Sequence, residues 1–405
     1  MRSRDPVPER RSFALALPRS PFSLRGLRWF EVDWHILAIA ALLLAVGIAL
    51  VRAMAQADDA MDRKGVDFGR HLEIVGLTLP MILVGMSLRP RWLRRKAWIV
   101  YAACLAVLVL LPFVGYVHNG ARRWIRMPGE FDFQPSELAK IGLVLFLARV
   151  LYRNRLERLK DWGPPLAAAL VPMALVAKQP DLGTAMSFVP ITLGMLYLAG
   201  ARAKVIGWFL AGAAVVVLVA YEFRIGPLHG YQFQRLDTWL EGFRARELIQ
   251  GKNSAAFHTY HARVAIGNGG LLGTGIGEGV ANRTGILPER DCDSVFAVIA
   301  EELGWLQTAG VMTLYTLMIA LLLGSASGIR DRFSRLAAGG IAMYFAAHFM
   351  INVGVNLGLI PMTGITLPLF STGGSSLLTT FLALGLAVGL AAHGEPALDR
   401  DAFHA

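Results

Sequence analysis

Charged residues are scarce in this chain. Asp, Glu, Lys and Arg make up only 17% of its 405 residues, whereas 55% are hydrophobic. A soluble domain carries about a quarter charged residues, so this composition argues against a soluble fold. Runs that alternate strictly between apolar and polar residues are also lacking, so nothing competes with a helical interpretation. The two cysteines, Cys104 and Cys292, show no metal-binding or redox spacing, and we expect no disulfide.

Long apolar runs, in contrast, are abundant. A helix that crosses the roughly 30 Å hydrocarbon core of a bilayer needs about 20 apolar residues. About ten such stretches follow one another, of which the fifth and sixth are short. They lie near residues 35–55, 71–88, 98–117, 135–152, 163–177, 184–200, 203–222, 304–324, 337–360 and 375–392. Because backbone groups in lipid must be paired within the protein, we predict an all-α polytopic membrane protein with about ten transmembrane helices.

The excess of positive charge follows a membrane pattern. A net charge of +11 could indicate a nucleic-acid-binding protein. Lys and Arg, however, cluster in short loops on alternate sides of the spans, as the positive-inside rule describes. We therefore expect a membrane partner and no nucleic acid, with both termini cytoplasmic. The chain then divides into a basic cytoplasmic segment (1–34), a transmembrane domain (35–392) and a cytoplasmic tail (393–405).

One connecting segment, residues 223–303, is long and is predicted to lie on the extracytoplasmic side. It contains a glycine run at 267–279, for which two interpretations stay open. The glycines could cradle a phosphate through backbone N–H groups, or they could let a re-entrant backbone pack closely against helices. A dinucleotide-binding fold is excluded, because no strand precedes the run.

Three further loops on the same side are rich in ionisable and turn-forming residues. Charges at the edge of the hydrocarbon are costly unless they are paired or face water, so these loops mark a functional cavity. The first contains Arg122, Arg123, Glu137 and Lys140, the second contains Asp181, and the third covers 361–376. Purely structural explanations also exist. Glu137 and Lys140 are spaced as an i,i+3 helical pair, and Asp181 is placed to cap the helix that follows it.

Carboxylates gather just before the eighth span. Glu289, Asp291 and Asp293 lie at its mouth, and mutual repulsion with partial desolvation would raise the pKa of at least one of them. A general base that operates near neutral pH needs such a pKa. The alternative is a solvated acidic turn that caps the helix. Glu301 and Glu302 sit deeper and are equally suited to anchoring helices through hydrogen bonds.

The polar segments together resemble the successive motifs of one known family. They are GARRWI (120–125), FQPSELAK (133–140), KQPDLGTA (178–185), AIGNGGLLGTGIGEG (265–279), LPERDCDSVFAVIAEELG (287–304) and NVGVNLGLIPMTGITLPLFSTGGSS (352–376). In this order they resemble the SEDS proteins, which include RodA and FtsW. The resemblance implies a ten-helix peptidoglycan glycosyltransferase of the bacterial inner membrane. It also implies that the enzyme extends glycan strands from lipid II beside a class B penicillin-binding protein, which acts as transpeptidase.

The resemblance assigns roles to individual residues. Asp293 matches the family's essential aspartate, which is expected to act as the base or to contact a metal at the reacting hydroxyl. Asp181 matches the aspartate of the QPDLGT motif, and Arg123, Glu137 and Lys140 match the polar set of the first outside motif. Total length and the QPDLGT context favour a RodA-like member, whereas the asparagine-rich stretch from 352 favours an FtsW-like one.

The type of charge adds candidates for substrate binding. Joining two lipid-linked sugars requires a base for the acceptor hydroxyl and stabilisation of the departing pyrophosphate. Arg122, Arg123, Lys140 and Arg263 can neutralise its phosphates. A divalent cation, Mg²⁺ or Mn²⁺, is an optional bridge between carboxylate and pyrophosphate, and no metal ligands are assigned to it.

The chain departs from the family pattern at a few positions. Relatives carry a His-Thr-Asp-Phe run where this chain has Asp291, Cys292, Asp293 and Ser294, a glutamine where it has His261, and a tyrosine where it has Thr372. Asp291 therefore adds an anion beside the expected base, where it could raise the base's pKa or recruit a cation, and we include it among the substrate-site residues.

Two other functions remain as alternatives. A transporter or flippase for the same lipid would also place charges in a helical cavity, but the chain shows no inverted repeat and its polar motifs lie on one face. A non-catalytic scaffold of the wall-synthesis complex would leave the carboxylate cluster unexplained.

Overall fold

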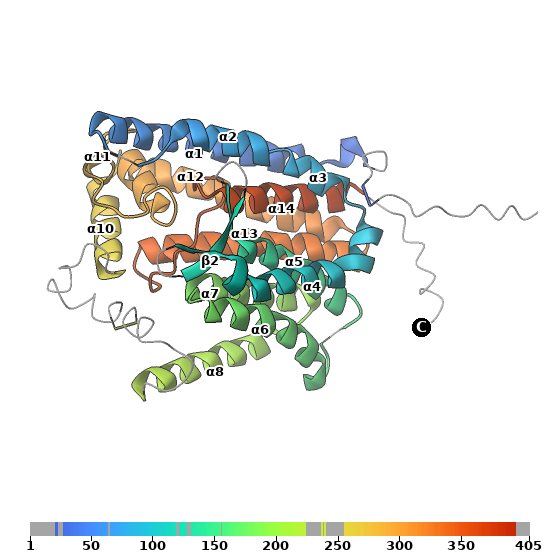
Figure 1. Ribbon diagram of the computed structural model, residues 1–405. Helices are drawn as coiled ribbons and strands as arrows, with labels where there is room; N and C mark the ends of the chain where they lie inside the picture. The colour runs from blue at the N-terminus through green and yellow to red at the C-terminus, as the bar shows by residue number, and fades with distance from the viewer. Residues whose placement is uncertain are drawn as a thin grey trace, which may run out of the picture.

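The structure is a computed structural model that describes residues 21–22, 27–63, 65–118, 121–127, 131–154, 156–223, 236–237, 239 and 255–393. Helices that run along one common direction dominate it (Figure 1). Within the described residues, six helices are long and apolar enough to cross a membrane by length and composition. The ten predicted spans all fall on helices, so the predicted all-helical membrane architecture is confirmed.

Each predicted span overlaps a helix, although the helices Pro90–Val114 and Val295–Gly328 begin eight and nine residues before the predicted limits. The helices are α1 (Trp34–Ala60), α2 (Phe68–Thr78), α3 (Met81–Ser87), α4 (Pro90–Val114), α5 (Pro135–Leu151), α6 (Gly163–Lys178), α7 (Leu182–Ala199), α8 (Ala203–Glu222), α10 (Ala255–Asn268), α11 (Val280–Thr284), α12 (Val295–Gly328), α13 (Arg332–Asn356) and α14 (Gly374–Ala392), with short 3-10 turns at Trp29–Glu31 and Leu159–Trp162. The second predicted span is divided into α2 and α3 at Pro80, which has no N–H to continue the helix.

Helix α13 lies at the centre of the bundle. It packs against α5, α7, α12 and α14, and it is mostly buried, as is α14. The outer helices α4 and α8 instead expose large apolar side chains such as Phe113 and Trp208, as expected for surfaces that face lipid. Polar residues on α13 therefore have no water nearby and must find partners inside the protein.

A small antiparallel sheet forms between α4 and α5, and the sequence did not predict it. Its strands are β1 (Tyr116–His118), β2 (Ala121–Met127) and β3 (Phe131–Phe133), in the order β1-β2-β3. The third predicted span, 98–117, was therefore wrong at both ends, since α4 begins at Pro90 and the chain is already a strand at Tyr116. β1 and β3 have three residues each, too few for a periodic pattern, and the seven residues of β2 do not alternate between apolar and polar, which explains why the sheet was missed.

The basic loops meet at one end of the bundle. Arg94 pairs with Asp331 at 3.4 Å, and Arg332 donates to the carbonyl oxygens of Asn154 (3.1 Å) and Ala199 (3.2 Å). The backbone N–H of Arg28 donates to the carbonyl oxygen of Ala392 at this same end (3.2 Å). The first and last elements of the described chain therefore lie beside the basic loops, as alternation across a membrane requires.

The glycine run packs against a break in α12. Gly304 has φ 74° and ψ 176°, so α12 consists of two helices joined at this residue. The amides of Thr274 and Gly275 donate to the carbonyl oxygens of Glu301 and Glu302, both at 3.0 Å. A Cβ atom on Gly273 would lie only 2.2 Å from the carbonyl oxygen of Glu302. Because these amides are already bonded to carbonyls, the structure favours the close-packing interpretation of the glycines over the phosphate cradle.

Candidate active site

The expected base lies in a tight turn that precedes α12. The carbonyl oxygen of Glu289 accepts hydrogen bonds from the amides of Cys292, Asp293 and Ser294 at 3.0–3.1 Å. Asp293 is half-buried, and its Oδ2 lies 3.2 Å from where a Cβ of Gly364 would be. The carboxylate therefore rests beside the backbone of the α13–α14 loop.

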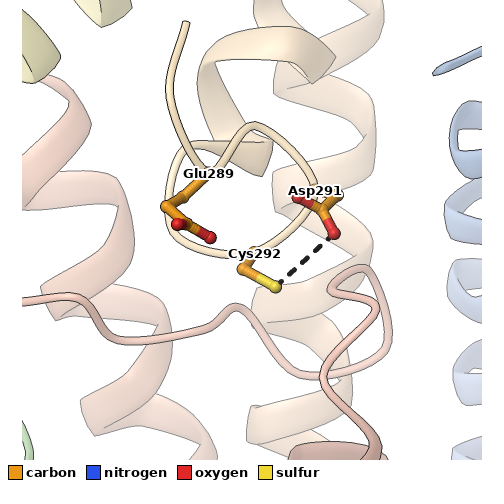
Figure 2. Close-up of side chains that lie close together, drawn as sticks. All are labelled: Glu289, Asp291 and Cys292. Carbon is orange, nitrogen blue, oxygen red and sulfur yellow. Dashed lines mark hydrogen bonds between the residues drawn. The ribbon is translucent and has the colours of Figure 1, made fainter. Parts of the chain in front are cut away.

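Three of the residues that depart from the family pattern, Asp291, Cys292 and Thr372, contact one another at this turn. The hydroxyl of Thr372 donates to the Asp291 carboxylate, and the Thr372 amide donates to the Asp291 carbonyl oxygen at 3.0 Å. The Cys292 thiol donates to Asp291 Oδ2 at 3.7 Å (Figure 2). Burial, followed by the charges of Asp291 and Asp293, raises the pKa of the Cys292 thiol well above its usual value. The Asp291 carboxylate is thus paired locally and differs in environment from Asp293.

Glu289, Asp291 and Cys292 bring ligand-type atoms within 4.8 Å of one another. The two carboxylates suit Mg²⁺ or Mn²⁺, which prefer oxygen ligands. The Cys292 sulfur does not, because sulfur is a soft ligand and these are hard cations. These three residues therefore make a poor site for Mg²⁺ or Mn²⁺, and the divalent cation considered from the sequence, to which no ligands were assigned, stays a prediction.

A buried ion pair, not anticipated from the sequence, fastens this turn to the first span. Arg290 and Asp58 are both buried, and the Arg290 guanidinium bonds the Asp58 carboxylate. Arg290 also donates to the carbonyl oxygen of Asn282 at 2.7 Å, and Arg63 lies 3.3 Å from Asp58. Because the two partners are far apart in sequence, no local pattern could reveal the pair.

Glu301 and Glu302 act as structural anchors, one of the two roles considered for them. Glu301 accepts from the Ala281 amide at 2.9 Å, and Glu302 accepts from the Asn282 side chain at 2.8 Å. Both carboxylates are buried behind the turn and tie α11 to α12.

A stripe of polar side chains on α13 connects the turn to the rest of the site. Asn352 and Asn356 each donate to the carbonyl oxygen of Asp293 at 3.0 Å, and His348 lies one turn further along the same helix. These three residues were not singled out as site residues. Their four-residue spacing on an otherwise apolar helix is the signal that could have found them.

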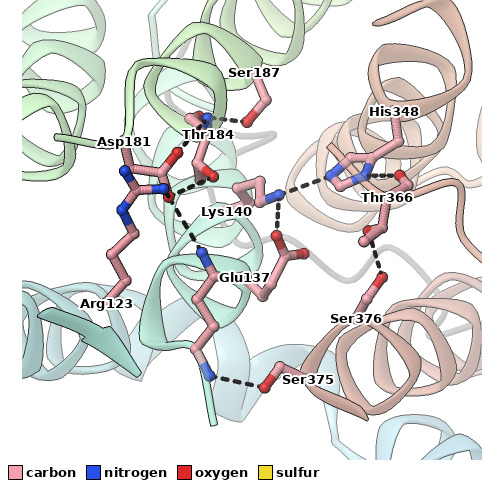
Figure 3. A network of polar contacts seen from close by, with 11 residues as sticks. Arg123, Glu137, Lys140, Asp181, Thr184, Ser187, His348, Thr366, Ser375 and Ser376 are labelled. Atoms are coloured by element: carbon pink, nitrogen blue, oxygen red, sulfur yellow. Dashed lines mark hydrogen bonds and ion pairs between the residues drawn. The ribbon is translucent and has the colours of Figure 1, made fainter. Parts of the chain in front are cut away.

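Lys140 and Glu137 form the predicted i,i+3 pair inside the bundle. Lys140 Nζ lies 2.7 Å from Glu137 Oε1 and 2.8 Å from His348 Nε2, and the lysine is fully buried (Figure 3). The α13 stripe therefore contacts Lys140 through His348 and the backbone of Asp293 one and two turns later. This connection places the first outside motif and the expected base in one network.

Arg123 and Asp181 form the opposite side of this network. Asp181 caps α7 by accepting from the Thr184 amide at 3.1 Å, and it also accepts from the Gln134 side chain at 3.2 Å. Arg123 Nη1 lies 3.8 Å from Asp181, and Arg123 Nε donates to the Gln179 carbonyl oxygen at 3.1 Å. Asp181 therefore serves as a helix cap and as part of the polar site.

The remaining candidates lie further out. Arg122 is exposed on β2 and donates to the carbonyl oxygen of Pro112 at 2.9 Å. Arg263 lies on α10, where its Cδ is 3.3 Å from the position of a Cβ on Gly358 in the α13–α14 loop. His261, on the same helix, contacts Phe257 with ring centroids 4.2 Å apart, and burial lowers the pKa of its imidazole. The roles of Arg122 and Arg263 in binding phosphate stay predictions.

Comparison with known proteins identifies the family. The family model for cell cycle proteins of the FtsW, RodA and SpoVE type matches residues 33–395. The chain belongs to this family. It is thus a multi-pass membrane protein of the SEDS family, and the resemblance read from the motifs is confirmed.

Curated relatives and solved structures agree with this assignment. The chain is 32% identical over 361 residues to the peptidoglycan glycosyltransferase MrdB of Escherichia coli, covering 88% of this chain and 92% of the relative. It is 35% identical over 391 residues to the probable peptidoglycan glycosyltransferase FtsW of Mycobacterium tuberculosis, covering 94% of this chain and 71% of the relative.

Two solved structures share the fold. A chain from a peptidoglycan synthase complex, described as coordinating polymerization and crosslinking, has a TM-score of 0.75 and 30% identity, with 90% and 98% of the two chains covered. The rod shape determining protein RodA of Thermus thermophilus has a TM-score of 0.66 and 28% identity, with 91% and 99% covered.

Proposed function

We propose that this SEDS protein is a peptidoglycan glycosyltransferase that polymerises lipid II at the outer face of the bacterial inner membrane. The observation that carries the proposal is the connection through α13, where one helix contacts both Lys140 and the backbone of Asp293. A carboxylate suited to deprotonation and cations suited to a pyrophosphate are thereby held in one rigid network.

The chemistry is a single displacement at the anomeric carbon of the donor. The Asp293 carboxylate removes the proton from the acceptor hydroxyl, and the resulting oxygen forms a bond to the anomeric carbon. The bond from this carbon to the pyrophosphate oxygen breaks, and undecaprenyl pyrophosphate leaves with the electron pair. One displacement inverts the anomeric centre and needs no second carboxylate as nucleophile.

The cations have different tasks in this account. Arg122 is exposed and Arg123 half-buried, and both can approach the phosphates directly. Lys140 is fully buried against Glu137, so its positive charge stabilises the anionic pyrophosphate through space and not by direct contact. Asp181 holds Arg123 close to the start of α7.

The proposed orientation in the membrane rests on the difference in charge between the two ends of the bundle. We place the basic loops and both termini in the cytoplasm by the positive-inside rule, which puts Asp293 on the outer side. The expected partner is a class B penicillin-binding protein with transpeptidase activity. The likeness to a chain from a peptidoglycan synthase complex supports this pairing.

The function is tested with purified protein in liposomes that contain fluorescent lipid-linked precursor, with and without a partner transpeptidase. We expect glycan polymer that lengthens with time. Movement of the labelled precursor between leaflets without polymer would favour the flippase alternative, and neither activity would favour the scaffold.

A further inference from the structure

His348 is completely buried in the middle of the bundle and uses both of its ring nitrogens. Its Nε2 lies 2.8 Å from the ammonium of Lys140 on α5. Its Nδ1 lies 3.0 Å from the carbonyl oxygen of Thr366, in the loop between α13 and α14. The imidazole therefore bridges α5 and the α13–α14 loop (Figure 3).

The chemistry of the two partners fixes the protonation of the ring. An ammonium has no lone pair, so Nε2 must accept its proton; a carbonyl oxygen cannot donate, so Nδ1 must carry hydrogen. Only the neutral Nδ1–H tautomer satisfies both contacts. An imidazolium would place a second cation 2.8 Å from Lys140, and the Nε2–H tautomer would direct two donors at each other.

We propose that His348 is a positioning residue for polymerisation, which in its neutral Nδ1–H form holds the Lys140 ammonium and fastens the α13–α14 loop over it. The proposal rests on the proposed function, because Lys140 is assigned to the active site there. None of the sequence motifs described above includes this histidine.

The charges around the imidazole are consistent with this form. Glu137 and Lys140 face it from α5, and their opposite charges cancel. The ring of Tyr344 on α13 lies beside the imidazole, with ring centroids 4.5 Å apart. Tyr315 of α12 is the titratable residue next to Tyr344. The α14 residues Gly374–Ala392 contain no titratable side chain. A third charge on His348 would therefore have no counter-ion among the described elements that pack around it.

A series of substitutions separates positioning from simple packing. His348→Gln keeps one acceptor and one donor in reach, so polymerisation should stay within about threefold of wild type. His348→Leu fills the space without either contact, and His348→Arg adds a cation. Both should lower the rate about tenfold or more, because His348→Leu removes the second hydrogen-bond acceptor of the Lys140 ammonium and His348→Arg places a like charge beside it. His393→Gln is the matched control, since this histidine bonds the carbonyl oxygen of Gly389 at the other end of α14.

The tautomer gives a readout that needs no activity. In membranes with ¹⁵N-labelled histidine, the difference spectrum between wild type and His348→Gln isolates the resonances of this ring. We expect a neutral ring with hydrogen on Nδ1, and a shift of the Nε2 resonance in the Lys140→Met variant. An imidazolium or an Nε2–H tautomer would overturn the proposal even if the protein polymerises lipid II. An Nδ1–H ring in a protein without polymerase activity would instead overturn the proposed function.

The polymerisation rates of the variants also test the positioning role of His348 independently of the spectrum. Equal rates for His348→Gln and His348→Leu, in variants with the same melting temperature, would show that the contacts do not position anything. A Gln variant that works and a Leu variant that folds but does not polymerise would support the role. If the His348→Leu variant fails to insert in the membrane, the difference spectrum between wild type and His348→Gln remains the deciding measurement.

Discussion

At the scale of single residues, the carboxylates before α12 have distinct surroundings although they are neighbours in sequence. Asp291 is bonded by Thr372 and by the Cys292 thiol, whereas Asp293 is fixed through its backbone by Asn352 and Asn356. Holding the backbone of Asp293 sets the direction of its side chain. The departures at 291, 292 and 372 form one bonded group, so they compensate one another locally.

The first prediction concerns the reactivity of Cys292. Its raised pKa results from burial and then from the anions Asp291 and Asp293. In a Cys104→Ala background, Asp291→Asn removes one anion and lowers the thiol pKa toward its usual value, so the thiolate fraction at pH 8 rises. Alkylation by iodoacetamide should accelerate about three- to tenfold. Glu278→Gln is the control, and an unchanged or slower rate in Asp291→Asn would contradict the assignment.

The second prediction concerns the buried pair of Glu137 and Lys140. Removing one partner leaves an uncompensated charge in the bundle, so Glu137→Gln or Lys140→Met alone should destabilise the protein by about 3–5 kcal/mol. The double variant should recover most of this loss, as a double-mutant cycle of thermal unfolding would show.

Activity separates two roles for the same lysine. If Lys140 only balances Glu137, the double variant should regain polymerisation together with stability. We expect stability to return while polymerisation stays low, because the positive charge under the site is gone. Full recovery of activity would refute a role for Lys140 toward the pyrophosphate.

At the scale of elements, the break in α12 depends on two glycines. Gly304 has φ 74°, and a Cβ there would lie 2.1 Å from the amide nitrogen of Gly273. Gly304→Ala should therefore destabilise the protein by about 1–3 kcal/mol. Gly310 lies on the same helix with nothing within 4 Å of its Cβ position, so Gly310→Ala should cost nothing. Equal melting temperatures for the two variants would contradict the packing described for the glycine run.

The sequence could predict those elements whose signal is local. Apolar runs located the spans, and the i,i+3 spacing of Glu137 and Lys140 located their pair. The strand that carries Arg122 does not alternate between apolar and polar residues, and its two neighbours have only three residues each. The break at Gly304 lies inside an apolar helix and could not be predicted from composition. The ion pair of Asp58 and Arg290 links distant segments and only appears once the chain is folded.

At the scale of the whole molecule, the loops sort to two ends of the bundle, which predicts a definite labelling pattern. In a background without Cys104 and Cys292, the exposed residues Thr284 and Arg95 are replaced singly by cysteine. A membrane-impermeant maleimide added to intact cells should label Thr284→Cys and leave Arg95→Cys unlabelled until the membrane is opened. Labelling of Arg95→Cys from outside would reverse the orientation and place Asp293 in the cytoplasm.

Much of the site could also be predicted, because its charged members lie in recognisable motifs. Asp293, Asp181, Arg123, Glu137 and Lys140 were all selected in advance, and the structure places the last four around one network. The α13 stripe was not predicted, because asparagine and neutral histidine lack the formal charge by which the other site residues stand out within apolar spans. Its importance follows from burial, which obliges each polar group to find a partner.

The central claim, that Asp293 is the base of a peptidoglycan polymerase, is tested most directly by Asp293→Asn. This variant keeps the shape of the side chain and the backbone bonds from Asn352 and Asn356 but cannot take a proton. Polymerisation of fluorescent lipid-linked precursor should fall by about 10²–10⁴-fold with an unchanged melting temperature, while the exposed Glu278→Gln stays at the wild-type rate. A folded Asp293→Asn protein that polymerises as fast as wild type would contradict the account.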